Sequence, residues 1–374
     1  MPAILSENLD MGAFFMREKL KQFYIVLLVF ILTIMGQYGH DLQSEAVFST
    51  QKENISAKSQ TGKRLTGQKS GEKVYASGAP IGIYIKTEGI LVLGLQQIDG
   101  KNSPASCKIK AGDYILKLNA QNITTKQQFI RLLQKNGEKE VVLTLKRKNK
   151  KIKVKVQPVY SAKNKCYQIG VWIRNDTQGI GTITFIREDG TFAALGHGIN
   201  DGDIGVRFLI ESGSAYRTTI SSILKGKSGM PGEIIGTIDY SPQNYLGEIY
   251  ANTNGGILGK ITENKKEFFT GKKISIAKKS EVKTGKAYLR SSISGKSKDY
   301  SIEIEKVFFH EKNSLKTLKI RVTDPELITL TGGIIQGLSG SPILQNGKLV
   351  GAVTHVLIDN PQMGYGIFAE SMLE

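Results

Sequence analysis

The first marked pattern along the chain is an uncharged stretch from Gln22 to Gly39, which contains a strongly apolar run at Phe23–Met35. Arg17, Lys19 and Lys21 precede it. A basic flank before an apolar run is typical of a signal sequence or a single spanning helix. No small-residue cleavage pattern follows, which favours an uncleaved anchor over a cleaved signal. The charge asymmetry predicts a cytoplasmic stub at 1–21, a membrane segment at 22–39 and the remaining chain outside the cytosol.

The pattern then changes twice. Residues 40–72 are polar, without helical or strand periodicity, and are predicted to be a tether. From about Lys73, short apolar runs with turn signals between them predict strands, for example at Ile81–Ile85 and Tyr114–Leu118. One helical pattern interrupts them at 125–134, with Thr124 or Thr125 as its cap. A closing hairpin follows, up to about residue 158.

After Tyr160 the chain is a series of short strands separated by glycine turns, with few helical patterns. This favours a β-barrel or a sandwich. The predicted layout is therefore mostly β, with one domain at 73–159 and a second at 160–374.

Charge and cysteine content narrow the function classes. The formal net charge is +18, but no zinc-finger spacing and no aromatic RNA-binding signature accompanies it, so we predict no nucleic-acid partner. A basic surface near an anionic membrane fits the apolar segment better. Cys107 and Cys166 are too few for a disulfide scaffold or a multi-cysteine zinc site, and their pairing stays open.

The strongest chemical motif is Gly337-Leu338-Ser339-Gly340-Ser341-Pro342. Acyl transfer needs a serine hydroxyl exposed on a tight turn, with backbone N–H groups nearby to hold an oxyanion. Flanking glycines permit such a turn. Ser339 is the candidate nucleophile, and the N–H groups of Gly337 and Ser339 are the candidate oxyanion hole.

A serine nucleophile needs a base, which is most often histidine. His40 lies in the tether and His310 follows a strand, while His355 stands on the strand after Ser339 and fits a structural role. His197 follows the apolar run Phe192–Leu195 and has glycines on both sides. It is the favoured base.

Residues 73–158 resemble a PDZ domain, because Ser103-Pro104-Ala105 is followed by an apolar position, Gly112-Asp113, a strand and Asn119. PDZ domains bind an extended peptide at a sheet edge beside a helix. The resemblance implies that Ile81, Gly82 and Ile83 form the peptide-binding loop.

The second domain resembles the trypsin-like peptidases, from whose Gly-Asp-Ser-Gly-Gly-Pro it departs at Leu338 and Ser341. Taken together, the anchor, the PDZ pattern, Ala194–His197, Arg321–Pro325 and Gly332–Pro342 resemble the stage IV sporulation protein B peptidase family. The family implies His197 as base, Ser339 as nucleophile and Asp324 as the acid. Asp324 lies close to Ser339 in sequence, and Asp239 is a second acid between the two.

The resemblance implies a trypsin-like double β-barrel and a role in sporulation. The peptidase would be secreted from the forespore into the intermembrane space, where it would cut a membrane-bound regulator of an intramembrane protease, and itself. Late sigma-factor activation would follow. The expected partners are therefore that substrate, a peptide ligand of the PDZ domain and the membrane.

Two other interpretations stay open from the sequence. One is a PDZ adaptor whose peptidase domain is inactive, although the chain retains His197 and Ser339. The other is a general extracytoplasmic stress protease, whose domain order is the reverse. No His-Glu-x-x-His motif or complete phosphate-binding loop is present, so neither a metal nor another cofactor is predicted.

Overall fold

The structure, a computed structural model, describes residues 71–262, 271–309 and 315–373. The predicted stub, the membrane segment 22–39, most of the tether, and both His40 and His310 lie outside these residues. Within the described ranges, no helix has the length and apolar character needed to cross a bilayer. Apart from residues 240–242, the described residues all fall in one compact unit.

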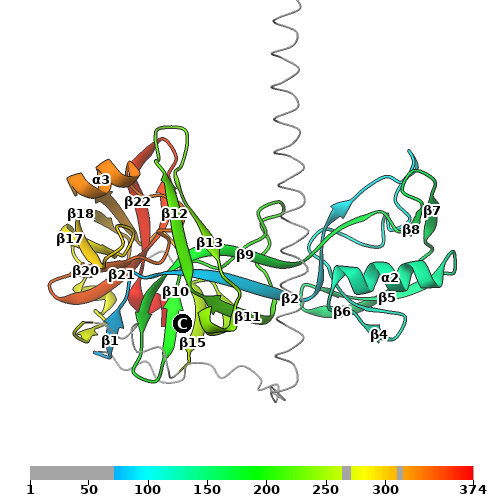
Figure 1. Ribbon diagram of the computed structural model, residues 1–374, viewed down its shortest axis with the longest axis horizontal. Helices are drawn as coiled ribbons and strands as arrows, with labels where there is room; N and C mark the ends of the chain where they lie inside the picture. Colours follow the sequence, from blue (N-terminus) through cyan, green and yellow to red (C-terminus); the bar gives the residue numbers. More distant parts are fainter. Residues whose placement is uncertain (1–70, 263–270, 310–314, 374) are drawn as a thin grey trace, which may run out of the picture. The chain divides into compact units, whose positions relative to one another are not determined.

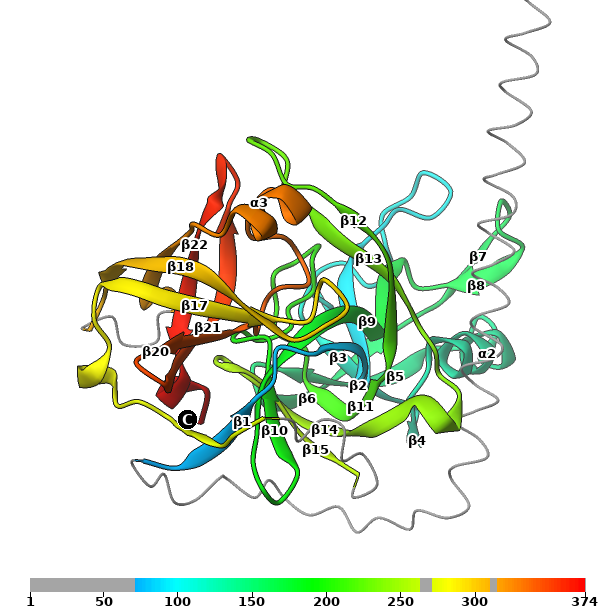
Figure 2. The same ribbon diagram turned by 60° about the vertical axis from the view of Figure 1, so that its left-hand side comes forward.

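The last third of the chain forms a closed six-stranded antiparallel barrel (Figure 2). Its strands, in order around the barrel, are β17 (Gly285–Ser291), β18 (Lys298–Val307), β19 (Leu318–Val322), β22 (Asn360–Phe368), β21 (Lys348–Leu357) and β20 (Pro342–Gln345). Period-two alternation drives this arrangement. On β18, for example, Tyr300, Ile302 and Ile304 are buried and alternate with more exposed residues.

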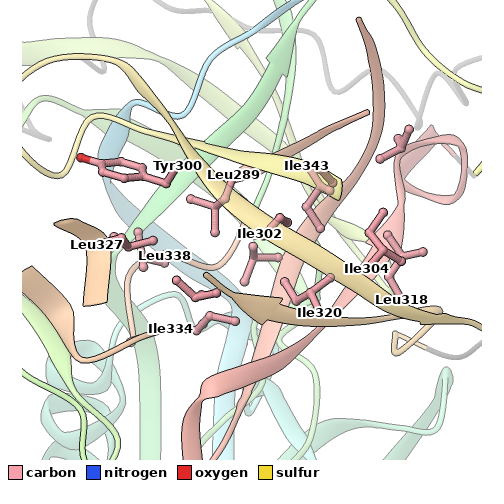
Figure 3. Packing of buried hydrophobic residues seen from close by; sticks show 14 of the residues in the cluster. Leu289, Tyr300, Ile302, Ile304, Leu318, Ile320, Leu327, Ile334, Leu338 and Ile343 are labelled. Atoms are coloured by element: carbon pink, nitrogen blue, oxygen red, sulfur yellow. The ribbon is translucent and has the colours of Figure 1, made fainter. Parts of the chain in front are cut away.

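These inward side chains form the largest apolar cluster, shown in Figure 3. Leu338, from the loop that carries Ser339, is part of this cluster and has no exposed surface. Fully burying a leucine contributes about 1.5–3 kcal/mol relative to exposing it. The core of the barrel therefore anchors the loop of the candidate nucleophile.

A second ring of six strands precedes this barrel in the chain. Each strand pairs with the next, and the last pairs with the first, in the order β9 (Val171–Ile186), β10 (Thr191–Ala194), β15 (Gly256–Ile261), β14 (Tyr245–Thr253), β11 (Ile210–Tyr216) and β2 (Pro80–Leu95). Its interior holds Ile81, Ile83, Phe192 and Ile249. The double β-barrel predicted from the sequence is therefore present.

Several smaller elements extend the two barrels. They are β1 (Lys73–Ala76) paired with β9 and β16 (Ile274–Ser275), the hairpin of β12 (Thr218–Leu224) and β13 (Glu233–Ile238), the helix α3 (Pro325–Thr331), and the 3₁₀ turns η1 (Pro242–Asn244), η3 (Lys279–Glu281) and η4 (Ala369–Leu373).

The PDZ part is a small sheet covered by one helix. Its elements are the second half of β2, β3 (Tyr114–Leu118), β4 (Gln121–Asn122), α2 (Lys126–Asn136), β5 (Val141–Arg147), β6 (Lys150–Val156), β7 (Val159–Ser161), β8 (Cys166–Gln168) and the start of β9. Thr125 caps α2 by accepting a hydrogen bond from the Gln128 N–H at 3.1 Å. Phe129 and Leu133 are buried on one face of the helix, as its periodicity predicts.

The domain boundaries differ from the predicted 73–159 and 160–374. β2 and β9 are both 16-residue strands, and they pair with each other in both parts of the molecule (Figure 1). Residues 73–87 belong to the first barrel, whereas Val171–Arg174 complete the PDZ sheet. At the junction, the Thr87 hydroxyl lies within hydrogen-bond distance of the Gly89 and Asn175 carbonyl oxygens, at 2.7 and 2.8 Å. The PDZ part is thus inserted into the first barrel and does not precede it.

The two cysteines, whose pairing could not be decided from the sequence, do not form a disulfide. Cys107 and Cys166 are both free thiols.

Candidate active site

The Ser339 loop is a tight turn between α3 and β20. Gly337 and Gly340 have φ angles of +98° and +95°, which residues other than glycine rarely adopt. Thr182 of β9 fixes the turn from the other barrel: its hydroxyl donates to the Gly337 carbonyl at 2.7 Å, and its N–H donates to the Ser339 carbonyl at 3.2 Å. Both carbonyls are therefore held on the side of β9.

The N–H groups of Gly337 and Ser339 have no hydrogen-bond acceptor among the described residues. Their neighbours differ: Leu338 N–H donates to Ile335 O, and Gly340 N–H donates to Val353 O. An oxyanion hole requires backbone N–H groups of this kind, free to donate and close to the nucleophile. These are the two N–H groups that the sequence predicts for the oxyanion hole, and their role there stays a prediction.

His197 follows β10 on a strained turn. Leu195 has a φ of +72° although it carries a side chain, and Gly196 continues the turn at +69°. The Nδ1 atom of His197 lies 3.0 Å from the Gly198 carbonyl oxygen. A carbonyl only accepts, so Nδ1 carries the proton and Nε2 of the neutral ring keeps its lone pair. This is the tautomer that can take a proton from serine.

His197 and Ser339, far apart in the sequence, line the same cavity of about 430 Å³. Among the described residues, no hydrogen bond joins Nε2 of His197 to the Ser339 hydroxyl. Instead, the Ser339 hydroxyl donates to the Thr354 carbonyl at 3.0 Å. Catalytic hydrogen bonds are often completed only when substrate binds, and a χ1 rotation of Ser339 would release its proton from Thr354.

A second histidine faces the same cavity. The ring centroids of His197 and His355 are 5.4 Å apart, and the buried Nδ1 of His355 has no hydrogen-bond partner within the described ranges. Burial is the main cause that lowers the pKa of His355 to about 4, and the nearby His197 and Lys316 act in the same direction. Burial also lowers the pKa of His197, against the Gly198 carbonyl, which raises it. Both rings are thus neutral near pH 7, as a general base must be.

Asp324 occupies a different position from the one its expected role requires. It is the N-cap of α3: Oδ1 accepts from the N–H groups of Glu326 and Leu327 at 3.0 and 3.1 Å, and Oδ2 accepts from Ser301 N–H at 3.1 Å. No hydrogen bond or ion pair joins it to His197 in the described ranges. The role of triad acid stays a prediction that this geometry does not support. Asp239, the second acid, accepts a hydrogen bond from Nδ2 of Asn244 at 2.6 Å.

Sequence reasoning missed Thr182, Thr354 and His355 as parts of this site. A threonine within a strand carries no motif, and His355 fitted a structural role equally well. Gln336 was missed too: its N–H donates to Gly232 O and its carbonyl accepts from Ile234 N–H, which ties the loop before Ser339 to β13. Only long-range pairing brings these residues together.

The predicted peptide-binding loop in the PDZ part needs correction. At Ile81, Gly82 and Ile83, β2 pairs with β9 on one edge and with β11 on the other, and both isoleucines are buried. No edge is left there for an added strand. These residues are part of the first barrel.

A similar tripeptide stands at Ile169-Gly170-Val171, beside α2. Gly170 has a φ of +68°, and the Ser103 hydroxyl contacts the Ile169 and Gly170 carbonyl oxygens, both at 2.9 Å. The N–H groups of Ile169 and Gly170 have no acceptor in the described part of the chain. Val171–Arg174 of β9 pair with β2 on one edge alone. The sequence signal was present, as Ile-Gly followed by a β-branched residue, but it lay outside the predicted PDZ boundaries.

The fold and the site together define a serine peptidase with a double β-barrel and a PDZ domain. The sequence pattern of the SpoIVB peptidase S55 family matches residues 165–373, and that of PDZ domains matches 100–147. The chain therefore belongs to the SpoIVB peptidase S55 family. No curated protein matches it.

Solved structures similar to parts of the chain share little sequence with it. The PDZ domain of an SdrC-like protein from Listeria monocytogenes is 19% identical, covers 24% of this chain and 90% of its own, and has a TM-score of 0.21. The Rv3671c protease from M. tuberculosis in its active form is 13% identical over 52% of this chain and 70% of its own, with a TM-score of 0.31. The HtrA-type protease AlgW with a decapeptide is 9% identical over 80% of this chain and 63% of its own, with a TM-score of 0.33.

Proposed function

We propose that this serine peptidase is an endopeptidase of sporulation signalling, which cleaves a membrane-bound regulatory protein and thereby starts intramembrane proteolysis and late sigma-factor activation. The observation that carries the peptidase chemistry is the convergence of Ser339, His197 and two unpaired N–H groups on one cavity. Membership of the SpoIVB family supports the sporulation role.

The chemistry follows from these positions. Nε2 of His197 takes the proton of Ser339 as the hydroxyl attacks the scissile carbonyl. The N–H groups of Gly337 and Ser339 then hold the negative oxygen of the tetrahedral intermediate. The same imidazole returns the proton to the leaving amine, and water repeats the sequence on the acyl-enzyme. No Asp, Glu, Lys or Arg is among the described residues that line the cavity, which favours substrates whose residues next to the scissile bond are uncharged.

Labelling with a fluorophosphonate tests the nucleophile. The full chain should be labelled at Ser339, and Ser339→Ala should abolish labelling. Ser341→Ala is the matched control. The buried hydroxyl of Ser341 has no hydrogen-bond partner in the part of the chain that the structure describes, so its loss should leave labelling intact. Labelling that survives in Ser339→Ala, or no labelling of the wild type, would contradict the peptidase chemistry.

The sporulation role has its own test in a spore-forming host that lacks its own member of the family. The wild-type chain and Ser341→Ala should restore late sigma-factor activity and processing of the membrane-bound regulator, and Ser339→Ala should restore neither. Restoration by Ser339→Ala would point to the adaptor function instead. Full proteolytic activity in vitro without restoration would favour a general stress protease.

We also propose self-cleavage in the tether, at positions before Glu72. The barrel begins there: Glu72 forms an ion pair with Arg187 at 2.8 Å, and Val74 on β1 is fully buried. The catalytic domain would then be released outside the cytosol from the membrane segment predicted at 22–39.

The PDZ part would bind a peptide carboxyl terminus at the Ile169–Gly170 N–H groups and add its strand to the free edge of β9. A decapeptide with an apolar last residue should shift the amide NMR signals of Ile169–Ile173 and α2 in the Ser339→Ala protein, and leave those of Ile81–Ile83 unchanged. The same peptide with an amidated terminus should bind at least about 10-fold more weakly, because it lacks the charge that the N–H groups would hold. Equal binding of both peptides would disprove carboxylate capture.

A further inference from the structure

Most of the positive charge of the chain lies in the PDZ part. Between the junction residues Thr87 and Asn175 there are 18 Lys and Arg against 5 Asp and Glu, which gives a net charge of +13, whereas the whole chain carries +18. These residues are less than a quarter of the sequence. Like charges concentrated on so small a domain repel one another, and an anionic partner would relieve that repulsion.

Five of these lysines lie on the face of the PDZ sheet that is opposite to its core. On β6, the apolar side chains pack into the core, so the alternating lysines point to the other side of the sheet. On β5, Leu143 and Leu145 are buried, and Lys146 follows with the opposite orientation. This lysine face consists of Lys117 on β3, Lys146 on β5, and Lys151, Lys153 and Lys155 on β6.

The strand register places these lysines next to one another. Lys146 stands directly opposite Lys151, and Thr144 has Lys153 on one side and Lys117 on the other. Neighbouring strands are only about 4.8 Å apart, so the ammonium groups form a dense array. Like charges directly opposite each other destabilise a sheet. The stability of the fold therefore does not account for the array.

Few carboxylates neutralise the lysine face. Lys146 pairs with Glu88 at 2.6 Å and Lys155 with Glu140 at 3.1 Å. The other three lysines of the face are exposed and form no ion pair among the described residues. Lysines on an edge strand such as β6 also discourage the addition of another strand. However, β3 and β5 each have a paired strand on both sides, so their lysines need another explanation.

The side chains of this face favour a lipid surface over a nucleic acid. Val142 and Thr144 stand between the lysines, and they offer neither a ring for base stacking nor a planar fork for phosphates. Arg147, at the end of β5, is already paired with Asp113 at 2.6 Å. Lysine ammonium groups are point charges on flexible stems, which suit a diffuse anionic surface such as phospholipid headgroups.

We propose that the lysine face of the PDZ part docks on an anionic phospholipid surface. Docking would leave the proposed peptide site accessible, because β6 and β9 are the two opposite edges of the PDZ sheet. It would also keep the domain at the membrane after the proposed self-cleavage before Glu72, because the whole face follows that residue. The inference goes beyond the proposed function and does not depend on the peptidase chemistry.

Acetylation footprinting of the full chain tests the docking. The Ser339→Ala chain, which lacks the nucleophile for self-cleavage, is placed in nanodiscs of phosphatidylcholine, alone or with about one third phosphatidylglycerol. Acetylation of the lysine face should be at least about 5-fold slower in the anionic discs, because each lysine near such a surface adds about that factor to the affinity. The difference should disappear in about 1 M salt. Equal acetylation in both kinds of disc would overturn the proposal.

Two charge-matched variants assign the effect to this face. The test variant carries the substitutions Lys117→Gln, Lys151→Gln and Lys153→Gln. The control variant loses the same charge at exposed positions outside the PDZ part, through Lys225→Gln, Lys227→Gln and Lys296→Gln. The substituted residues are all exposed, so both variants should fold, which circular dichroism checks. The test variant should dock about 100-fold more weakly, so Lys146 and Lys155 should lose their protection in it and keep their protection in the control.

Duplex DNA provides the comparison with another anionic partner. Protection of the lysine face by DNA without protection by anionic discs would replace the lipid surface with a nucleic acid. Loss of protection in the control variant to the same extent as in the test variant would show general attraction and would also overturn the proposal. The measurement needs no turnover, so its failure would leave the peptidase chemistry to be decided by labelling of Ser339.

Discussion

Ser339→Ala and His197→Ala should each lower kcat by roughly 10⁴–10⁶-fold, and the double variant should be hardly slower than either. The two side chains act as one unit, because the base has nothing to deprotonate without the hydroxyl and the hydroxyl is a weak nucleophile without the base. The residual rate would come from the Gly337 and Ser339 N–H groups, whose backbone is unchanged in both variants. Hydrolysis of a fluorogenic peptide by the full chain, with circular dichroism to confirm folding, measures this.

Asp324→Asn is the informative companion to this pair. Asparagine caps helices about as well as aspartate, so α3 should keep its N-terminus and stability should fall by less than about 1 kcal/mol. Because Asp324 has no hydrogen bond to His197, kcat should stay within a few-fold of the wild type. A loss near 10⁴-fold would instead assign Asp324 the triad role that the family implies. For the first pair, losses in kcat that multiply in the double variant would show that Ser339 and His197 do not act together.

The candidate site could be predicted from the sequence where its signals are local. The glycines around Ser339 and the apolar strand before His197 are short-range features, because they encode a turn and a strand end. The oxyanion residues follow from the same turn. Helix α2 was equally predictable, since Thr125 caps it and its apolar face repeats with helical periodicity.

The rest depends on pairing between distant segments. Ile81-Gly82-Ile83 and Ile169-Gly170-Val171 carry nearly the same pattern, and which of them has a free edge is decided by β11, a strand far from both in sequence. The insertion of the PDZ part into the first barrel follows from the same long strands. Non-local register is what single-sequence patterns specify least.

Gly340→Ala should destabilise the protein by at least about 3 kcal/mol. The φ angle of Gly340 is +95°, and a Cβ there would overlap the Thr182 carbonyl and the Leu195 N–H, both backbone atoms of the first barrel. Neither atom can move freely, since Thr182 also holds the Ser339 turn and Leu195 begins the His197 loop. The close approach of the two barrels at Gly340 is therefore the contact that brings nucleophile and base together.

Gly295→Ala is the control that separates backbone strain from the steric clash. Its φ of +89° is almost the same, but a Cβ there would meet nothing within 4 Å. The backbone strain alone should cost about 1–2 kcal/mol. Urea unfolding of both variants, monitored by circular dichroism, gives the difference, which we attribute to the clash between the barrels. If Gly340→Ala were no less stable than Gly295→Ala, the barrels would not meet closely at this glycine, and the joint placement of His197 and Ser339 would lose its structural basis.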